Sequence, residues 1–172
     1  MEIVSPGIAV FRNYFLRDEE AIYQAESSNK WRPGTAGNQV NPNARITDIH
    51  DLDNQSEIHK ELLNTFLAGM SEYVNHYKHL SISNGEHLRI GRYQEGGHYS
   101  THADSSDGKR ILSGVIYLNS DYEGGEIYFP NQNIELKPEA GMLLLFPSNF
   151  LFIHGSKPIT KGNKYICVSW FS

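Results

Sequence analysis

The sequence predicts a mainly β fold of the α+β class, in which helices come first and a jelly roll or sandwich follows. Within residues 58–77, apolar side chains recur every three or four positions, as on one face of a helix. Within residues 86–172, short apolar runs alternate with turn residues, which is typical of a jelly roll. A chain of 172 residues can bury one sizeable core, and no composition break marks a second one. We therefore expect a single domain over residues 1–172, with a helical support roughly at 1–85 and the jelly roll roughly at 86–172.

The first half should contain a short strand, a helix and a long loop. Residues 8–11 are all apolar and predict a strand. A helix should run from Asp18 to about Ser27 or Ser28, with Asp18 as its N-cap and acidic residues in its first turn. Residues 29–53 are rich in Gly, Pro, Asn and Asp, which predicts turns, with a brief strand around 45–47. Because long loops in compact domains are usually functional, we expect this one to be a lid or a substrate contact.

The strongest helical pattern follows this loop. Asp53 or Asn54 can cap the helix, and an apolar stripe then repeats at spacings of three and four. The stripe consists of Ile58, Leu62, Leu63, Phe66, Leu67, Met70, Tyr73, Val74 and Tyr77. Such a stripe packs against a core, so the helix should lie on the outside of the major sheet.

From residue 86 onward the pattern is one of short strands. Glycine and asparagine pairs separate several of them and predict turns. The expected strands are residues 87–93, 98–103, 110–118, 125–129, 133–136, 141–146, 150–154 and 164–171. A barrel of about eight strands follows from this spacing.

Two histidines and one aspartate in the second half have the residue types of a metal site. His102 and Asp104 lie two positions apart, which places both side chains on one face of a strand or its extension. His154 ends an apolar run much later in the chain. Two imidazoles and one carboxylate hold a divalent metal and leave coordination positions open, as in non-haem Fe(II) oxygenases.

The last predicted strand can direct a lysine into the interior. Alternation places its side chains on two opposite faces. One set is Lys164, Ile166, Val168 and Trp170, and the other is Tyr165, Cys167, Ser169 and Phe171. If Ile166 and Val168 point inward, Lys164 does too, and a buried ammonium without an anion is costly. A diffusible dicarboxylate that also chelates the metal would supply the anion; the alternative is a lysine that simply reaches solvent from the start of the strand.

A longer series of motifs surrounds these residues. The series consists of Tyr-x-x-Gly-x-x-Tyr-x-x-His-x-Asp at 93–104, a basic residue at Arg110 before Tyr117-Leu118, Gly-Gly-Glu leading to Phe-Pro at 124–130, Pro-x-x-Gly at 138–141, and then His154, Lys164 and Trp170. In its order and spacing, this series resembles the Fe(II)/2-oxoglutarate-dependent dioxygenases, and specifically their prolyl 4-hydroxylase-like branch.

The resemblance implies a double-stranded β-helix, which is a jelly roll, and a metal centre within it. It implies that His102, Asp104 and His154 bind Fe(II). In the related halogenases a small residue replaces the carboxylate and chloride takes its place on the metal. Because Asp104 leaves no such vacancy, hydroxylation is the expected chemistry.

The resemblance also implies residues for the co-substrate and the substrate. Lys164 would pair with the C5 carboxylate of 2-oxoglutarate, Tyr93 would hydrogen-bond to it, and Trp170 would pack near it. Tyr99 and Arg110 would lie nearest the substrate. For Trp170, Tyr99 and Arg110, plain packing or a surface ion pair is the alternative. The implied cofactors are Fe(II), 2-oxoglutarate as co-substrate and O2, with ascorbate as a reductant.

The implied reaction hydroxylates an unactivated C–H bond and releases succinate and CO2. Peptidyl proline is the expected substrate. A free amino acid or another small molecule is the alternative, and a non-catalytic metal-binding jelly roll is the second alternative. Several family members carry a basic residue after the strand-final Trp, where this sequence reads Phe171-Ser172; the prolyl substrate is therefore the leading expectation and not the sole one.

Composition narrows the expected partners. A net charge of −5 and a pI near 5.9 argue against a nucleic-acid binder. The sequence has no apolar run long enough for a transmembrane helix, and residues 1–6 lack the pattern of a secretory signal. The single cysteine, Cys167, excludes an intrachain disulfide. We expect a cytoplasmic protein that acts on a proline-containing peptide or protein, or on a small molecule, without nucleic acid or membrane; the sequence predicts no oligomeric state.

Overall fold

Fifteen strands and two α-helices make up the part of the chain that the structure describes, residues 1–37 and 39–172 of a computed structural model. The helices are α1 (Asp18–Ser28) and α2 (Glu57–His76), and two short 3-10 helices are η1 (Pro130–Gln132) and η2 (Phe150–Phe152). The strands are β1 (Glu2–Ser5), β2 (Ile8–Phe11), β3 (Arg32–Pro33), β4 (Arg45–Ile46), β5 (Asp48–Asp51), β6 (Arg89–Tyr93), β7 (His98–His102), β8 (Leu112–Tyr117), β9 (Glu123–Gly124), β10 (Ile127–Phe129), β11 (Ile134–Leu136), β12 (Leu143–Pro147), β13 (His154–Ser156), β14 (Ile159–Lys161) and β15 (Lys164–Phe171).

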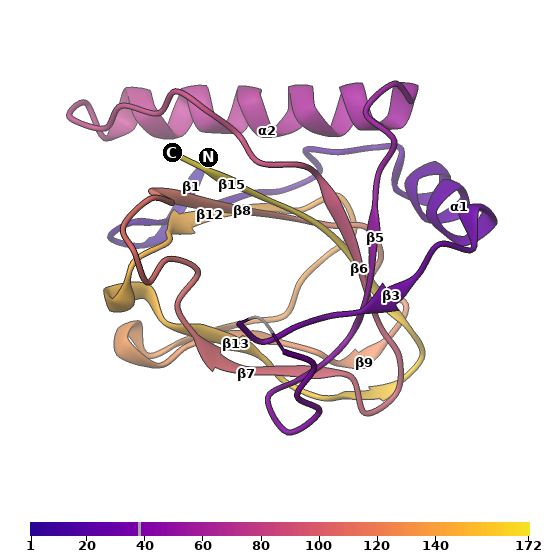
Figure 1. The fold of residues 1–172 in the computed structure, drawn as a ribbon. Coiled ribbons are helices and arrows are strands. Elements are labelled where there is room, and N and C mark those ends of the chain that lie inside the picture. Colours follow the sequence, from indigo (N-terminus) through magenta and orange to yellow (C-terminus); the bar gives the residue numbers. More distant parts are fainter. Residues whose placement is uncertain (38) are drawn as a thin grey trace.

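The strands form two facing antiparallel sheets with both helices on one side (Figure 1). The larger sheet has eight strands in the order β1-β2-β12-β8-β15-β6-β5-β3, and the smaller has five in the order β11-β10-β13-β7-β4. Strands β14 and β9 form a small third sheet. The predicted jelly roll with helices outside the major sheet is confirmed, although the sheets do not close into a barrel. The first half is also less purely helical than expected, because residues 1–85 contribute β1–β5.

Helix α2 covers the outer face of the larger sheet (Figure 1). Phe66 on this helix is fully buried and its ring lies 5.8 Å from that of Phe171 on β15. A Cβ at Gly69 would collide with Leu143 of β12, so the glycine permits the close approach of helix and sheet. The N-cap is Ser56, whose hydroxyl accepts from the amide of His59 at 3.1 Å. The predicted caps at 53–54 are therefore wrong: Asp53 instead accepts from the amide of Gln55 in the preceding turn.

Helix α1 follows the predicted range, but its N-cap is Arg17 and not Asp18, which lies in the first turn. The acidic first turn suits the positive end of the helix dipole even without a side-chain cap. Arg92 of β6 anchors the helix to the sheet by pairing with Glu26 at 3.0 Å and with Asp48 at 2.8 Å. This pairing fixes α1 against the same outer face that α2 covers.

Strand β15 separates two hydrophobic cores. Tyr165, Cys167 and Phe171 belong to the outer core beneath the helices. Ile166 belongs to the inner core between the sheets, and Val168 packs against it. The predicted alternation is confirmed, and it places Lys164 on the inner side, where the residue is 2% exposed.

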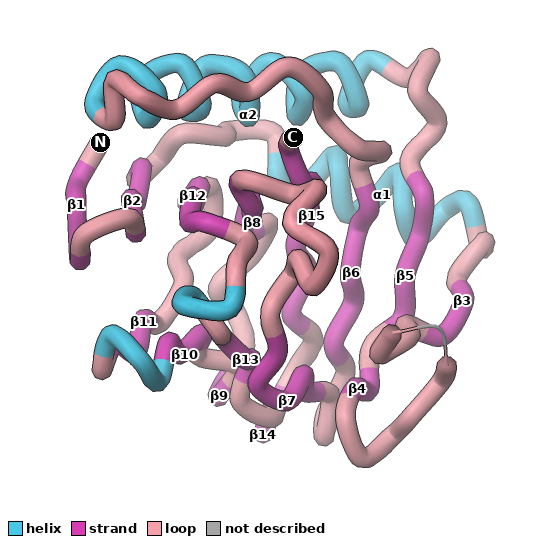
Figure 2. Tube along the Cα trace, turned by 60° about the vertical axis from the view of Figure 1, so that its left-hand side comes forward, coloured by secondary structure: helices cyan, strands magenta, loops and turns pink. Residues whose placement is uncertain are grey.

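The predicted loop 29–53 is built into both sheets. Its strands β3 and β5 extend one edge of the larger sheet, while β4 pairs with β7 in the smaller sheet (Figure 2). The brief strand expected around 45–47 is confirmed by β4, whereas β3 and β5 were not expected. Asn38 in this segment lies outside the described residues, and the lid remains a prediction.

Residues 150–154 do not form the predicted strand. The side chain of Asn149 accepts from the amide of Leu151 at 3.0 Å and starts the 3-10 helix η2. Strand β13 begins only at His154. This capping turn delivers His154 to the start of a strand rather than to the end of one.

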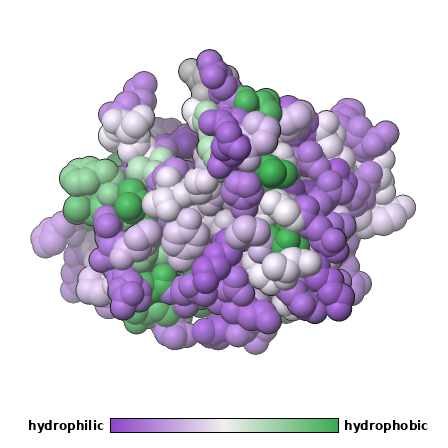
Figure 3. Space-filling view, turned by 90° about the horizontal axis from the view of Figure 1, so that it is seen from below, coloured by the Kyte–Doolittle hydropathy of each residue, from purple (hydrophilic) through white to green (hydrophobic). Residues whose placement is uncertain are grey.

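The outer face of the smaller sheet, seen from below in Figure 3, is mostly hydrophilic, with apolar side chains in separate groups. Among the described helices, none is long and apolar enough to cross a membrane.

Candidate metal centre

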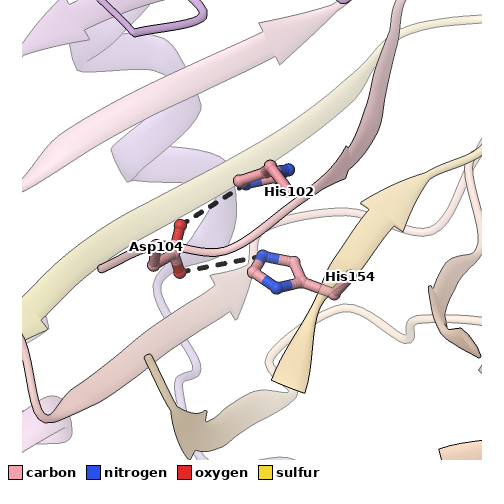
Figure 4. Close-up of side chains that lie close together, drawn as sticks. All are labelled: His102, Asp104 and His154. Carbon is pink, nitrogen blue, oxygen red and sulfur yellow. Dashed lines mark ion pairs between the residues drawn. The ribbon is translucent and has the colours of Figure 1, made fainter. Parts of the chain in front are cut away.

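His102 and His154 lie directly opposite one another on the antiparallel strands β7 and β13. Asp104 follows His102 two residues beyond the end of β7. One ligand atom from each of the three residues lies within 4.8 Å of the other two, as Figure 4 shows for their converging side chains. Strand pairing thus brings together the three residues that the sequence singled out.

Both imidazoles are held by backbone carbonyls. Nδ1 of His102 lies 2.9 Å from the carbonyl oxygen of Ser100, and Nδ1 of His154 lies 3.1 Å from that of Phe152. A carbonyl accepts only, so each Nδ1 carries the proton and donates it, which leaves Nε2 with a lone pair. Nε2 of His102 and of His154 face the carboxylate of Asp104, at 3.4 and 3.7 Å.

The charges of the three groups suit a divalent cation. Burial lowers the pKa of His154 to about 4, against the opposing effect of Asp104, so the ring is neutral at pH 7. Burial alone would raise the pKa of the Asp104 carboxyl, but the two imidazoles and a serine hydroxyl together bring it below its usual range. Two nitrogen lone pairs and a carboxylate therefore converge, which is the donor set that Fe(II) takes in non-haem oxygenases.

A pair of buried serines supports Asp104, and sequence reasoning missed both. Ser113 on β8 donates to Oδ2 of Asp104 at 2.6 Å, and its hydroxyl lies 2.8 Å from that of Ser148. Arg110 also donates to the backbone carbonyl of Asp104 at 3.1 Å. Ser113 could have been recognised as a polar residue on the inward face of an otherwise largely apolar strand. These contacts fix the carboxylate relative to the two histidines.

Lys164 lies in the same cavity, of about 320 Å³, as the three metal-site residues. Its ammonium donates to the carbonyl of Gly125 at 2.6 Å and to the hydroxyl of Ser156 at 2.9 Å. Burial lowers the pKa of Lys164 to about 7, against a weaker opposing effect of Glu126. Among the described residues, no carboxylate comes within 4.0 Å of this ammonium. The cavity therefore holds a buried cation that is matched only by neutral oxygens.

Tyrosines border Lys164. Its Nζ lies 5.3 Å from the ring centre of Tyr93 and 5.4 Å from that of Tyr117. Tyr93 was an expected co-substrate contact, whereas Tyr117 was noted only as the end of a strand. The position of Tyr117 follows from the inward face of β8, which the motif alone did not reveal.

The other predicted residues also line the cavity. Tyr99 stacks on His102, with ring centres 3.6 Å apart. Trp170 lies under the guanidinium of Arg110, whose Cζ is 4.0 Å from the ring centre. Arg110 also pairs with Glu86 at 2.5 Å, so it is both an ion-pair residue and a cavity residue. Arg45 and Arg89 are cationic lining residues that the sequence did not suggest.

Residues 88–172 match the model of the 2OG-Fe(II) oxygenase superfamily. The chain is 31% identical over 129 residues to a putative prolyl 4-hydroxylase of Acanthamoeba polyphaga mimivirus, a match that covers 63% of this chain and 53% of that protein. It is 33% identical to the probable prolyl 4-hydroxylase 9 of Arabidopsis thaliana over 51% of this chain and 41% of the relative. The chain thus spans about half or less of the length of these two relatives.

Solved structures show the same fold. A prolyl hydroxylase of Trichoplax adhaerens in complex with a hypoxia inducible factor peptide fragment superposes with a TM-score of 0.83 at 20% identity, over 96% of this chain and 83% of that chain. A prolyl-4-hydroxylase of Pseudomonas putida gives a TM-score of 0.76 at 20% identity, over 96% and 92% of the two chains. The family match carries with it Fe(II), 2-oxoglutarate and O2 as cofactors, which the His-Asp-His set fits. Residues 88–172 place this chain in the 2OG-Fe(II) oxygenase superfamily, and the two relatives compared above carry the names of prolyl 4-hydroxylases.

Proposed function

We propose that this protein is an Fe(II)- and 2-oxoglutarate-dependent dioxygenase that hydroxylates a C–H bond, with a prolyl residue of a peptide as the leading substrate. The observation that carries the proposal is that one cavity is lined by a metal-ligand triad and by a buried lysine whose described hydrogen-bond partners are neutral oxygens. The prolyl substrate is supported by the names of the curated relatives and by the peptide in the Trichoplax complex.

Different residues of the cavity would bind the metal and the co-substrate. His102, Asp104 and His154 would hold Fe(II), which when bound with 2-oxoglutarate supplies the O2 chemistry. Lys164 would receive the C5 carboxylate of 2-oxoglutarate, because a charge-assisted hydrogen bond compensates the burial of its ammonium. The hydroxyl group of Tyr93 would donate to the same carboxylate from the neighbouring strand.

The walls of the cavity would keep water away from the reacting atoms. Ile166 and Val168 line it with apolar side chains, and Trp170 lines it beyond them on the same strand. Tyr99 fixes the ring of His102 by stacking on it. A non-catalytic metal-binding protein has no use for Lys164, which disfavours that alternative.

The proposal is tested by measuring succinate formed from 2-oxoglutarate. Formation should require Fe(II) and O2, and ascorbate should prolong it. His154→Ala should abolish it, because one imidazole ligand is lost. His98→Ala is the matched control, since His98 is a histidine of β7 outside the triad. Wild-type succinate formation in His154→Ala would refute the metal assignment.

A further inference from the structure

The cavity is lined by more cations than its cofactors require. Arg45, Arg89, Arg110 and Lys164 all line it, whereas Asp104 is the one carboxylate among the described lining residues. Two of the arginines face carboxylates outside the cavity. Arg110 pairs with Glu86 at 2.5 Å, and Arg89 lies 3.4 Å from Asp51, which also pairs with Arg32 at 2.7 Å.

Arg45 has neutral partners instead. Its Nε donates to the hydroxyl of Thr47 at 2.8 Å, and its Nη1 donates to the carbonyl oxygen of Thr35 at 3.0 Å. Within the described part of the chain, no carboxylate lies within 4.0 Å of the Arg45 guanidinium. The side chain is partly buried and is held in place, so its charge is presented to the cavity without compensation.

Strand pairing places this guanidinium close to the metal centre. Arg45 on β4 is the cross-strand partner of Tyr99 on β7, and its Cζ lies 4.4 Å from the centre of the Tyr99 ring. Tyr99 in turn stacks on the metal-site residue His102. One aromatic ring therefore separates Arg45 from a metal ligand, within reach of a substrate bound beside the metal.

A sum of the charges in the cavity, which rests on the proposed function, leaves one positive charge without a negative partner. A divalent iron, the Asp104 carboxylate and the two carboxylates of 2-oxoglutarate sum to one negative charge, which Lys164 cancels. The positive charge of Arg45 remains. A partly desolvated guanidinium binds a carboxylate well, because its fork of donors matches two oxygens. We propose that the substrate carries a carboxylate that pairs with Arg45 while the C–H bond to be hydroxylated lies beside the metal.

This carboxylate has two possible sources, the α-carboxylate of a free amino acid or the acidic group of a peptide. Both differ from an uncharged prolyl peptide, which would leave Arg45 uncompensated. The two sources share one chemistry at Arg45, and matched substrates separate them.

The first experiment measures binding alone. Acetate, with acetamide as the neutral control, is titrated into protein loaded with Zn(II) and 2-oxoglutarate, and the backbone amide resonances of β4 and β7 are followed by NMR. Acetate should give saturable shifts and acetamide none. Arg45→Gln should weaken acetate binding at least roughly tenfold, while Arg12→Gln, an exposed arginine paired with Glu2 and Glu139, should not.

Arg45→Lys is a second variant in case the glutamine variant does not fold; it keeps the charge, loses the fork and should weaken binding to a smaller degree. The proposal is overturned if acetate gives no saturable shift, or if the shift persists unchanged in both Arg45 variants. Because Zn(II) supports no turnover, this result does not depend on whether the protein is a dioxygenase.

The second experiment compares substrates by the mass of the hydroxylated product. L-proline is matched with L-prolinamide, and a capped prolyl peptide containing glutamate is matched with its glutamine counterpart. The acidic member of at least one pair should be favoured, and Arg45→Gln should raise its KM roughly tenfold to a hundredfold. Equal hydroxylation of the acidic and neutral members of both pairs by the wild type, or an unchanged KM for the acidic members in Arg45→Gln, would overturn the proposal. Failure of the dioxygenase function would appear separately, as the absence of Fe(II)- and O2-dependent succinate in the wild type.

Discussion

Lys164 and Tyr93 are cross-strand partners on β15 and β6, and the lysine ammonium lies 5.3 Å from the centre of the tyrosine ring. The pair places a cation and a phenol side by side at the inner end of the cavity. Both side chains are buried, and burial raises the pKa of the Tyr93 hydroxyl as it lowers that of Lys164. A carboxylate bound here would favour the protonated form of Lys164 and would accept a hydrogen bond from the hydroxyl of Tyr93.

The affinity for 2-oxoglutarate should therefore fall as pH rises above about 7. Burial lowers the pKa of Lys164 to about 7, and a bound carboxylate raises it again, so binding above this pH takes up a proton. Affinity is fully present below the lower pKa and falls roughly tenfold per pH unit above it. Isothermal titration of 2-oxoglutarate into Zn(II)-loaded protein measures the slope. In Lys164→Arg, whose charge is permanent, the slope should vanish; pH-independent binding by the wild type would contradict the prediction.

A divalent metal should stabilise the fold by binding to the triad. A ligand at about a hundred times its Kd adds about 2.7 kcal/mol, which corresponds to roughly 5–10 °C in Tm for a chain of this size. Thermal unfolding with saturating Zn(II), and again after chelation, measures this shift. His102→Ala should lose the shift, whereas His87→Ala, an exposed histidine outside the triad, should keep it. An equal shift in both variants would mean that the metal binds elsewhere.

Ser113→Ala should weaken metal binding about tenfold or more. The hydroxyl of Ser113 donates to Asp104 at 2.6 Å, and without it the carboxylate can turn away from the two histidines. A Co(II) titration followed by visible absorption measures the affinity. Ser169→Ala is the control, because it removes another buried hydroxyl, one that donates to the carbonyl of Glu86 and does not line the cavity. Equal metal affinity in Ser113→Ala and the wild type would show that Ser113 only packs.

Phe66→Ala should destabilise the protein by about 3–5 kcal/mol. The ring is fully buried between α2 and the larger sheet, and its removal leaves a cavity in the outer core. Urea denaturation measures the free energy of unfolding. Leu67→Ala, the next residue on the helix and 43% exposed, should change it by less than about 1 kcal/mol. A small effect of Phe66→Ala would mean that α2 does not depend on this contact.

The sequence predicted those features that rest on alternation and on residue type. The inward direction of Lys164 followed from the period of a strand, and the grouping of His102, Asp104 and His154 followed from ligand chemistry. The direct pairing of His102 with His154 could not be predicted, because strand register depends on long-range contacts.

Other features were hidden by local composition. Residues 29–53 contain turn residues throughout, yet β4 forms there because β7 offers it a partner in the folded chain. Arg45 was missed for this reason, since nothing in the sequence places it beside Tyr99. Composition also did not reveal that Ser56 caps α2, since the side chain of Asp53 accepts from the amide of Gln55 in the preceding turn.

Because side chains alternate along β15, half of its positions are constrained by folding and the other half by catalysis. Folding constrains Tyr165, Cys167 and Phe171, since they belong to the core beneath the helices. Catalytic turnover constrains Lys164 and Trp170, since they line the cavity. In a library that randomises β15, a screen for soluble expression should therefore constrain one set of alternate positions, and a screen for succinate release should constrain both.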